Sequence, residues 1–216
     1  MKILSVSDIV LASLRNRENL LKNYSNAQAV ISCGDLPADY LEYITGVLNV
    51  PLMYVRGNHD IYYTHDKPGG DDLHGRVVRF NGYLIAGLQG CMRYNREPLQ
   101  YSDGEMLRLV LALWPTVLYA TLRRRRRLDL MVTHSPAWGI HDLPDRAHQG
   151  FKSFRLMIRL FRPRTLIHGH VDNVDKRLPS RTLFADTEIL NINPAKVLDL
   201  GELRRVRATE QPVSSR

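Results

Sequence analysis

The sequence contains little cysteine and nothing that marks it for export. Its 216 residues include only Cys33 and Cys91, and neither lies in a paired motif. Isolated cysteines are more typical of small buried apolar residues than of a disulfide framework, so we expect a reducing, cytoplasmic location. The N-terminal stretch Met1 to Asp8 carries one lysine and an early aspartate, which is unlike a secretory signal.

The sequence also lacks internal repeats, low-complexity linkers and a clear domain boundary. A chain of this length can bury a substantial core, so we expect one domain over residues 1–216. The apolar stretch from Leu109 to Leu122 is too short and too interrupted for a membrane span.

Basic residues outnumber acidic residues in the sequence. The net charge is +8 and the pI about 9.7, with arginine concentrated in Arg123 to Arg127 and in Arg155 to Arg164. This balance favours anionic partners such as phosphoesters, nucleic acid or acidic lipid, without choosing among them. Before the arginine run, Ser102 to Leu122 is predicted to be helical, with Pro115 as a kink or a helix boundary. We favour an amphipathic surface helix with solvated arginines; a nucleic-acid or lipid contact and a homodimer surface are the alternatives.

Short apolar runs alternate with helical patterns over much of the chain. The early helices are predicted at Leu14 to Tyr24 and Ala38 to Leu48. Five runs of strand length end in polar residues: Lys2 to Val6, Ala29 to Cys33, Leu52 to Val55, Leu128 to Val132 and Thr165 to Ile167. Buried strands alternating with helices predict an α/β protein with some parallel pairing.

Other segments predict antiparallel strands. Arg76 to Gly87 has Asn81-Gly82 between two apolar runs, which is a strong hairpin signal. Thr182 to Leu200 predicts two or three short strands, with Asn193-Pro194 as a turn. Together these patterns favour two sheets packed face to face with helices outside.

The polar residues after the strands are of the types that bind metals. Gly57-Asn58-His59-Asp60 follows the third run, and Asp8, Asp35, His134 and His170 follow the others. The C-terminal ends of strands in α/β sheets commonly meet at one site. Oxygen and imidazole ligands without thiolates suit Mn, Fe or Zn, and such metals can position a phosphoryl group and activate water.

In this order, five blocks resemble the calcineurin-like metallophosphoesterase family: Asp8, Gly34-Asp35, Gly57-Asn58-His59-Asp60, Thr133-His134 and Gly169-His170. The resemblance runs from residue 8 to residue 172. It implies a four-layer α/β/β/α sandwich of two mixed β-sheets flanked by helices. It also implies hydrolysis of a phosphomonoester or phosphodiester with a bound pair of divalent metals, for which Mn is our first choice.

The resemblance assigns roles residue by residue. Asp35 would bridge the two metals, while Asn58, His134 and His170 would complete the second site. His59 would donate a proton or stabilise the transition state, with Asp60 orienting it. The first site departs from the family pattern, because Asp8-Ile9-Val10 and His170-Val171-Asp172 each lack one expected histidine. Asp172 either replaces an imidazole with a hard carboxylate oxygen or only forms a hydrogen bond nearby, so one or two ions are expected.

Further polar residues are candidates for substrate contact. Arg93 and Asn95 follow the glycine-flanked segment Gly87 to Gly90, and His141 and His148 follow His134. Loops beside a scaffolded site often bind ligand, although surface histidines are also common.

Three functions therefore compete: a metal-dependent phosphoesterase, a degenerate member that binds one metal or a phosphorylated ligand with little turnover, and a nucleic-acid-binding or nuclease protein. The first is favoured by the intact Asn58-His59-Asp60 unit. The second is favoured by Val10 and Asp172, and the third by the basic charge.

Overall fold

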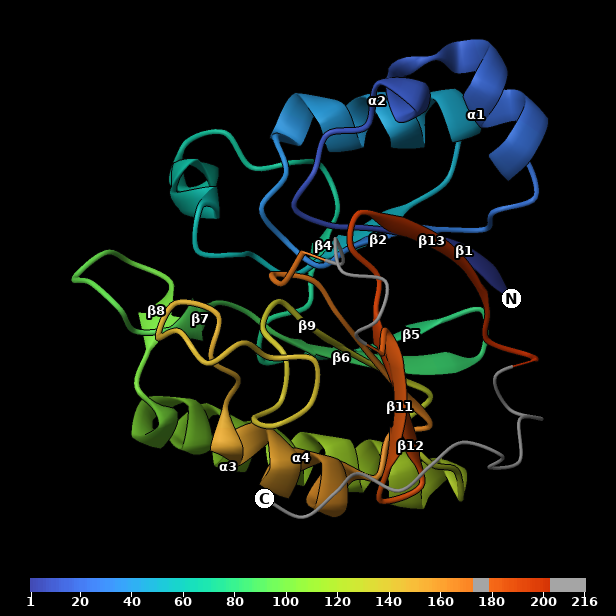
Figure 1. The fold of residues 1–216 in the computed structure, drawn as a ribbon. Helices are drawn as coiled ribbons and strands as arrows, with labels where there is room; N and C mark the ends of the chain where they lie inside the picture. The colour runs from blue at the N-terminus through green and yellow to red at the C-terminus, as the bar shows by residue number, and fades with distance from the viewer. Residues whose placement is uncertain (173–178, 203–216) are drawn as a thin grey trace.

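The computed structural model describes residues 1–172 and 179–202, and its elements are arranged in four layers (Figure 1). Two mixed β-sheets lie face to face, with a pair of helices on the outer side of each. The predicted α/β/β/α sandwich is thereby confirmed. The single-domain prediction also includes residues 173–178 and 203–216, which lie outside the described residues.

The first sheet has the order β13-β1-β2-β3-β4, and it carries three of the strand ends singled out above. Strands β1 to β4 are parallel, and β13 pairs with β1 in the antiparallel direction. The bounds are β1 Lys2–Val6, β2 Val30–Ser32, β3 Leu52–Tyr54, β4 Asp71–Asp72 and β13 Ala195–Asp199. Helices α1 (Arg17–Tyr24) and α2 (Ala38–Leu48) cover its outer face.

The second sheet has the order β11-β12-β10-β9-β6-β5. Its bounds are β5 Val77–Phe80, β6 Tyr83–Leu88, β9 Leu130–Thr133, β10 Thr165–His168, β11 Arg181–Phe184 and β12 Thr187–Asn191. Helices α3 (Asp103–Arg124) and α4 (Lys152–Phe161) cover its outer face. A separate two-stranded ribbon joins β7 (Cys91–Met92) to β8 (Gln100–Tyr101).

Three hydrophobic clusters hold the layers together. Side chains such as Ile31, Val132 and Ile167 fill the space between the sheets. The other two clusters lie between each sheet and its helices. Cys33 and Cys91 are buried and free, which confirms that they act as small apolar residues.

Local sequence explains where the elements turn or end. The predicted Asn81-Gly82 hairpin joins β5 to β6, and both residues have positive φ, as a two-residue hairpin turn requires. The predicted helix over Leu14 to Tyr24 is instead divided into the 3-10 helix η1 (Ala12–Arg15) and α1. Asn16 causes this division, because its side chain accepts a hydrogen bond from the N–H of Asn19 and caps α1.

Pro115 does not end a helix, so that part of the prediction is wrong. Helix α3 runs through it without interruption. Pro115 and Leu111, whose carbonyl oxygen loses its helical partner, are both exposed, so water can supply the missing hydrogen bond. At the start of α3, Ser102 and Glu105 form a capping box that fixes the first turn.

Candidate metal centre

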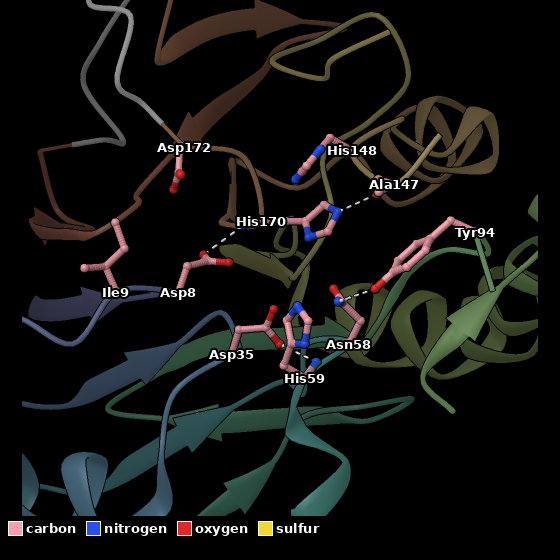
Figure 2. Close-up of a pocket in the computed structure, with 10 residues that line it drawn as sticks. All are labelled: Asp8, Ile9, Asp35, Asn58, His59, Tyr94, Ala147, His148, His170 and Asp172. Atoms are coloured by element: carbon pink, nitrogen blue, oxygen red, sulfur yellow. Dashed lines mark hydrogen bonds between the residues drawn. The ribbon is translucent and has the colours of Figure 1, made fainter. Parts of the chain in front are cut away.

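Five parallel strands from both sheets direct their C-terminal ends toward one site. Asp8 follows β1, Asp35 follows β2 and Asn58 follows β3, while His134 follows β9 and His170 follows β10. Figure 2 shows four of these five side chains, those of Asp8, Asp35, Asn58 and His170, around one pocket. Residues far apart in the chain meet here because the two sheets present the same edge.

Four of these residues form a set that could hold a metal ion. Asp8, Asp35, His134 and His170 each offer one ligand atom, and these atoms all lie within 4.8 Å of one another. Nε2 of His134 lies 3.3 Å from Oδ2 of Asp35 and 3.1 Å from Oδ1 of Asn58. The amide oxygen of Asn58 is therefore a fifth donor beside the cluster.

The two imidazoles are oriented as metal-binding histidines usually are. Nδ1 of His134 lies 2.8 Å from the carbonyl oxygen of Cys33, and Nε2 of His170 lies 2.7 Å from that of Ala147. A carbonyl oxygen can only accept, so each of these nitrogens carries a proton and donates it. The other nitrogen of each ring can then offer a lone pair to a cation. The donor set fits a divalent metal.

The charges of the cluster favour a cation between its side chains. Burial alone would lower the pKa of His134, but the carboxylates of Asp35 and Asp8 outweigh it and raise that pKa to about 9. Burial would raise the pKa of Asp35, yet His134 lowers it to about 2. The imidazole thus takes up a proton to balance the buried carboxylates. A divalent cation would supply that positive charge directly and release the proton.

Three of the candidate ligands have an unusual backbone. The φ angles of Asp8, Asp35 and His170 are 63°, 58° and 66°, which lie in the left-handed region. Each costs on the order of 1 kcal/mol for a residue with a side chain. The fold holds each of the three in place with a hydrogen bond: the backbone N–H of His170 donates to Oδ2 of Asp8 at 2.9 Å, and Oδ1 of Asp35 accepts from His59. Such strain commonly collects at functional sites.

His59 and Asp60 are placed differently from each other. His59 is exposed and lines the pocket, and its backbone N–H donates to Oδ1 of Asp35 at 2.8 Å. Asp60 is buried, and its Oδ2 accepts hydrogen bonds from the backbone N–H groups of Gly57 and Asp35 at 2.7 and 2.8 Å. Burial and the carboxylate of Asp35 raise the pKa of Asp60 to about 6. Asp60 thus positions the loops of Asp35 and Asn58, whereas we had predicted it to orient the His59 ring.

The residues at the two positions where the resemblance implies histidines are Val10 and Asp172. Val10 is 41% exposed and has no ligand atom. Asp172 lines the pocket, but its Oδ1 accepts a hydrogen bond from Nδ2 of Asn193 at 3.1 Å. Asp172 is also outside the four-residue cluster described above.

The residues predicted to contact substrate lie in different places. Arg93 is paired with Glu105 at 2.8 Å, and the side chain of Asn95 accepts from the backbone of Glu97, so neither lines the pocket. His141 is turned toward His168 and Thr182, at 2.9 Å from each. These three residues do not reach the pocket because other polar groups engage them.

His148 is the predicted contact that does line the pocket. Its Nδ1 lies 2.8 Å from Oδ1 of Asp145, and its ring lies 5.2 Å from that of His170. Tyr94 lies in the loop Arg93-Tyr94-Asn95 that was expected near the site, but only Arg93 and Asn95 were predicted as contacts. Its hydroxyl accepts a hydrogen bond from Nδ2 of Asn58 at 3.3 Å, which turns the Asn58 oxygen toward His134.

The pocket has a volume of about 560 Å³, which is within the range of small-molecule sites. Its lining residues are Asp8, Ile9, Asp35, Asn58, His59, Tyr94, Ala147, His148, His170 and Asp172. No lysine or arginine is among these lining residues. The arginine run Arg123 to Arg127 lies away from the pocket. Arg126 donates to the carbonyl oxygen of Gly82, and Arg127 donates to that of Arg162. These contacts lie at the N-terminal ends of β9 and β10, whereas His134 and His170 follow the C-terminal ends of these strands.

Comparison with known proteins agrees with this fold. The crystal structure of TT1561 of Thermus thermophilus is similar to this chain, with a TM-score of 0.65, 17% sequence identity, and 94% of this chain and 95% of that chain covered. A further crystal structure matches with a TM-score of 0.64 and 16% identity over 93% of this chain and 95% of that chain. At these identities the matches show a shared fold.

No curated protein matches the sequence. The family model of the calcineurin-like phosphoesterases, in contrast, matches residues 1–173, which is most of the chain. The matched region contains every candidate metal ligand. The chain belongs to the calcineurin-like phosphoesterase family.

Proposed function

We propose that this protein hydrolyses a small phosphoester with a divalent metal bound at the cluster. The observation that carries the proposal is the orientation of His134 and His170. Each ring donates from one nitrogen to a backbone carbonyl and leaves the other nitrogen beside buried carboxylates. This arrangement is typical of metal ligands.

Asp8, Asp35, Asn58, His134 and His170 are the residues that would hold the metal. When bound, a divalent metal supplies Lewis acidity, which polarises a phosphoryl oxygen and activates water. Three of the five donors are hard oxygens and two are imidazoles, a set that suits Mn or Fe and also admits Zn. Mn is therefore our first choice.

The chain's own residues would bind and orient the phosphoester and transfer its proton. His59 is exposed at the pocket while its backbone is fixed by Asp35, so its imidazole can reach a leaving oxygen and donate a proton to it. His148, oriented by Asp145, presents a second imidazole to the same pocket. Tyr94 holds the Asn58 amide so that the oxygen of that amide faces the cluster.

The lining of the pocket favours a small substrate over a long anionic polymer. Because no lysine or arginine lines it, the negative charge of a phosphate would be balanced by the metal, while the imidazoles of His59 and His148 would offer hydrogen bonds. Two members of the arginine run, Arg126 and Arg127, donate to backbone carbonyl groups away from the pocket. A nucleic acid would find no basic track of pocket residues to follow.

Hydrolysis of aryl phosphoesters tests the proposal. Metal-free protein is supplied in turn with Mn, Fe, Zn and Mg and incubated with p-nitrophenyl phosphate and bis(p-nitrophenyl) phosphate. We expect turnover with Mn, and a loss of about 100-fold or more in Asp35→Asn and in His134→Ala. The two substrates distinguish a monoesterase from a diesterase. A folded protein that is inactive with all four metals would contradict the proposal.

A second candidate is a family member that binds one metal or a phosphorylated ligand with little turnover. It is favoured by the exposed Val10 and by the hydrogen bond that engages Asp172 with Asn193. Elemental analysis gives the number of ions per chain, and two tightly bound ions would dismiss this candidate. If the first site is the deficiency, then Val10→His combined with Asp172→His should raise both the metal content and the rate.

A further inference from the structure

We propose that the outward face of α3, together with the arginines that flank it, docks on the surface of a bilayer containing anionic lipid. This surface lies on the outer side of the second sheet and shares no residue with the pocket. The proposal goes beyond the phosphoesterase activity and does not depend on it.

The outward face of α3 carries an apolar stripe. Leu111, Trp114, Leu118 and Leu122 follow one another at intervals of three or four residues, and Tyr119 lies next to Leu118, so all five recur on one side of the helix. Between 37% and 67% of each is exposed: Leu111, Trp114, Leu118, Tyr119 and Leu122. The opposite side of α3, with Met106, Val110, Leu113 and Val117, packs into the core. The helix therefore buries one apolar face and leaves a second one uncovered by residues 1–172 and 179–202.

Basic side chains flank the stripe at both ends. Arg108 precedes it, Arg123 to Arg125 follow it, and the fourteen residues between Arg108 and Arg123 are uncharged. The side chains of Arg108, Arg124 and Arg125 have no ion pair or hydrogen bond with the part of the chain that the structure describes. They are free to meet an anionic surface.

Beyond the first turn of α3, which contains Asp103 and Glu105, neither α3 nor α4 contains an acidic residue. None occurs between Met106 and Leu128, nor between Lys152 and Arg164, which includes all of α4. Helix α4 packs beside α3 and adds Lys152, Arg155 and Arg159 to this layer. Apolar and aromatic side chains bordered by cations are typical of helices that lie in the interface of an anionic membrane.

Lying on the membrane fits the dimensions better than crossing it. Helix α3 has the length and composition of a membrane span, but one face of it belongs to the core of the second sheet layer. The uncharged segment would extend for about 21 Å as a helix, short of the ~30 Å of a hydrocarbon core. The exposed side chains alone can enter the lipid, while the buried face stays in the protein.

A second copy of the chain fits the same surface poorly. Antiparallel pairing of two α3 helices about Pro115 would bring Arg108 of one chain opposite the arginine run of the other. Parallel pairing would place each arginine against its own counterpart. The acidic residues that could offset this repulsion are already engaged: Asp103 accepts from the backbone of Ser153, and Glu105 is paired with Arg93. Nucleic acid would meet the arginines but leave the leucines of the stripe without a partner.

Vesicle sedimentation with the full chain tests the proposal. We expect binding to vesicles of phosphatidylcholine mixed with phosphatidylglycerol, weak binding to phosphatidylcholine alone, and a fall in binding as salt is raised. Leu118→Ser combined with Leu122→Ser should weaken binding by about tenfold or more. Arg124→Gln combined with Arg125→Gln should weaken it roughly fivefold for each arginine removed.

Matched controls lie on α1, at the opposite side of the molecule. Leu21→Ser removes another exposed leucine, and Arg17→Gln with Lys22→Gln removes two exposed cations. Both should bind vesicles as the wild type does. In a Trp138→Phe background, Trp114 is the sole tryptophan, so its emission should shift to the blue on addition of the anionic vesicles.

Several outcomes would overturn the proposal. One is that the wild type does not bind anionic vesicles. Another is that the variant with Leu118→Ser and Leu122→Ser binds them as well as the wild type does. A dimer that this variant converts to a monomer, with no vesicle binding, would assign the face to a second copy. Salt-sensitive binding to duplex DNA or RNA without vesicle binding would assign the arginines to nucleic acid. Denaturant unfolding of each variant separates lost binding from lost folding, and the arginine pair, which is solvent-exposed, tests the proposal even if the leucine pair unfolds the chain.

Discussion

Asp60 accepts a hydrogen bond from the backbone N–H of Asp35 at 2.8 Å, which joins the segments that follow β2 and β3. The same carboxylate oxygen accepts a second hydrogen bond from the N–H of Gly57 at 2.7 Å. Two loops that carry candidate metal ligands are therefore fixed to each other by one buried atom. The metal centre depends on this connection as much as on the ligands themselves.

Replacing Asp60 separates the hydrogen bonds from the charge. Asp60→Ala leaves two backbone N–H groups without an acceptor, so we expect it to lower the free energy of unfolding by about 2–4 kcal/mol. Asp60→Asn keeps an oxygen that can accept both bonds and should cost less than half of that. Denaturant unfolding of the metal-free proteins gives both values. Equal losses in the two variants would mean that the charge, rather than the pair of bonds, matters.

Gly57 lies so close to the metal cluster that a side chain cannot fit there. A Cβ at this position would lie 2.0 Å from Oδ1 of Asp35 and 2.6 Å from Cε1 of His134. We expect Gly57→Ala to abolish tight metal binding and to destabilise the fold by about 1–3 kcal/mol. Metal content and unfolding measurements test this. The control is Gly46→Ala in α2, where nothing lies within 4 Å, and it should gain about 0.5–1 kcal/mol.

Tyr94 should influence the metal through Asn58. Tyr94→Phe removes the acceptor of the Asn58 amide group, so the amide oxygen is no longer held toward the cluster. We expect a loss of about tenfold in Mn affinity, measured by calorimetric titration of metal-free protein, with little change in stability. Tyr62→Phe, which alters a tyrosine 62% exposed, should leave affinity unchanged. A similar affinity in both variants would exclude a role for the Tyr94 hydroxyl.

His141 should make the stability depend on pH. Burial and then Lys196 lower the pKa of His141 to about 4, below the ordinary value of 6.5. Between pH 6.5 and pH 4, His141 is protonated in the unfolded chain but not in the folded chain. The free energy of unfolding therefore falls as the pH is lowered from about 6.5 to about 4. At about pH 4, His141 lowers the free energy of unfolding by about 2–3 kcal/mol relative to pH 6.5 and above.

His141→Gln isolates that share, because glutamine can still form hydrogen bonds with His168 and Thr182. We expect the variant to lose less stability than the wild type over the same pH window, in metal-free protein monitored by denaturant unfolding. His65→Gln, which alters an exposed histidine, should follow the wild-type profile. A variant of His141 with an unchanged slope would contradict the assignment.

Much of the fold could be predicted because its signals are local. Apolar runs such as Lys2 to Val6 become strands with the predicted start and end, and Ala38 to Leu48 is a helix with the predicted bounds. Asn81-Gly82 specifies its hairpin through the backbone freedom of those two residues. The predicted helix boundary at Pro115 was wrong, because exposure of one helix face relieves the cost of proline, and exposure is a tertiary property.

The candidate site could also be predicted only in part. The positions after strand ends could be found in the sequence, since parallel strands of an α/β sheet share an edge. The direction of a loop side chain could not. Arg93 and Tyr94 are neighbours in the sequence. Arg93 forms an ion pair with Glu105 outside the pocket, whereas the hydroxyl of Tyr94 accepts a hydrogen bond from Asn58 and lines the pocket.

The sequence by itself determined the positions of the strands along the chain and the side chains that follow them. These side chains are carboxylates, an amide and imidazoles, and positions 10 and 172 hold valine and aspartate instead of histidine. Only the tertiary structure decided which nitrogen of His134 and His170 faces the cluster, that Asp60 binds backbone rather than an imidazole, and that α3 leaves an apolar face outside. The reason is physical. Strand and helix patterns arise from neighbours in the chain, whereas ring orientation, hydrogen-bond partners and exposure arise from atoms that only folding brings together.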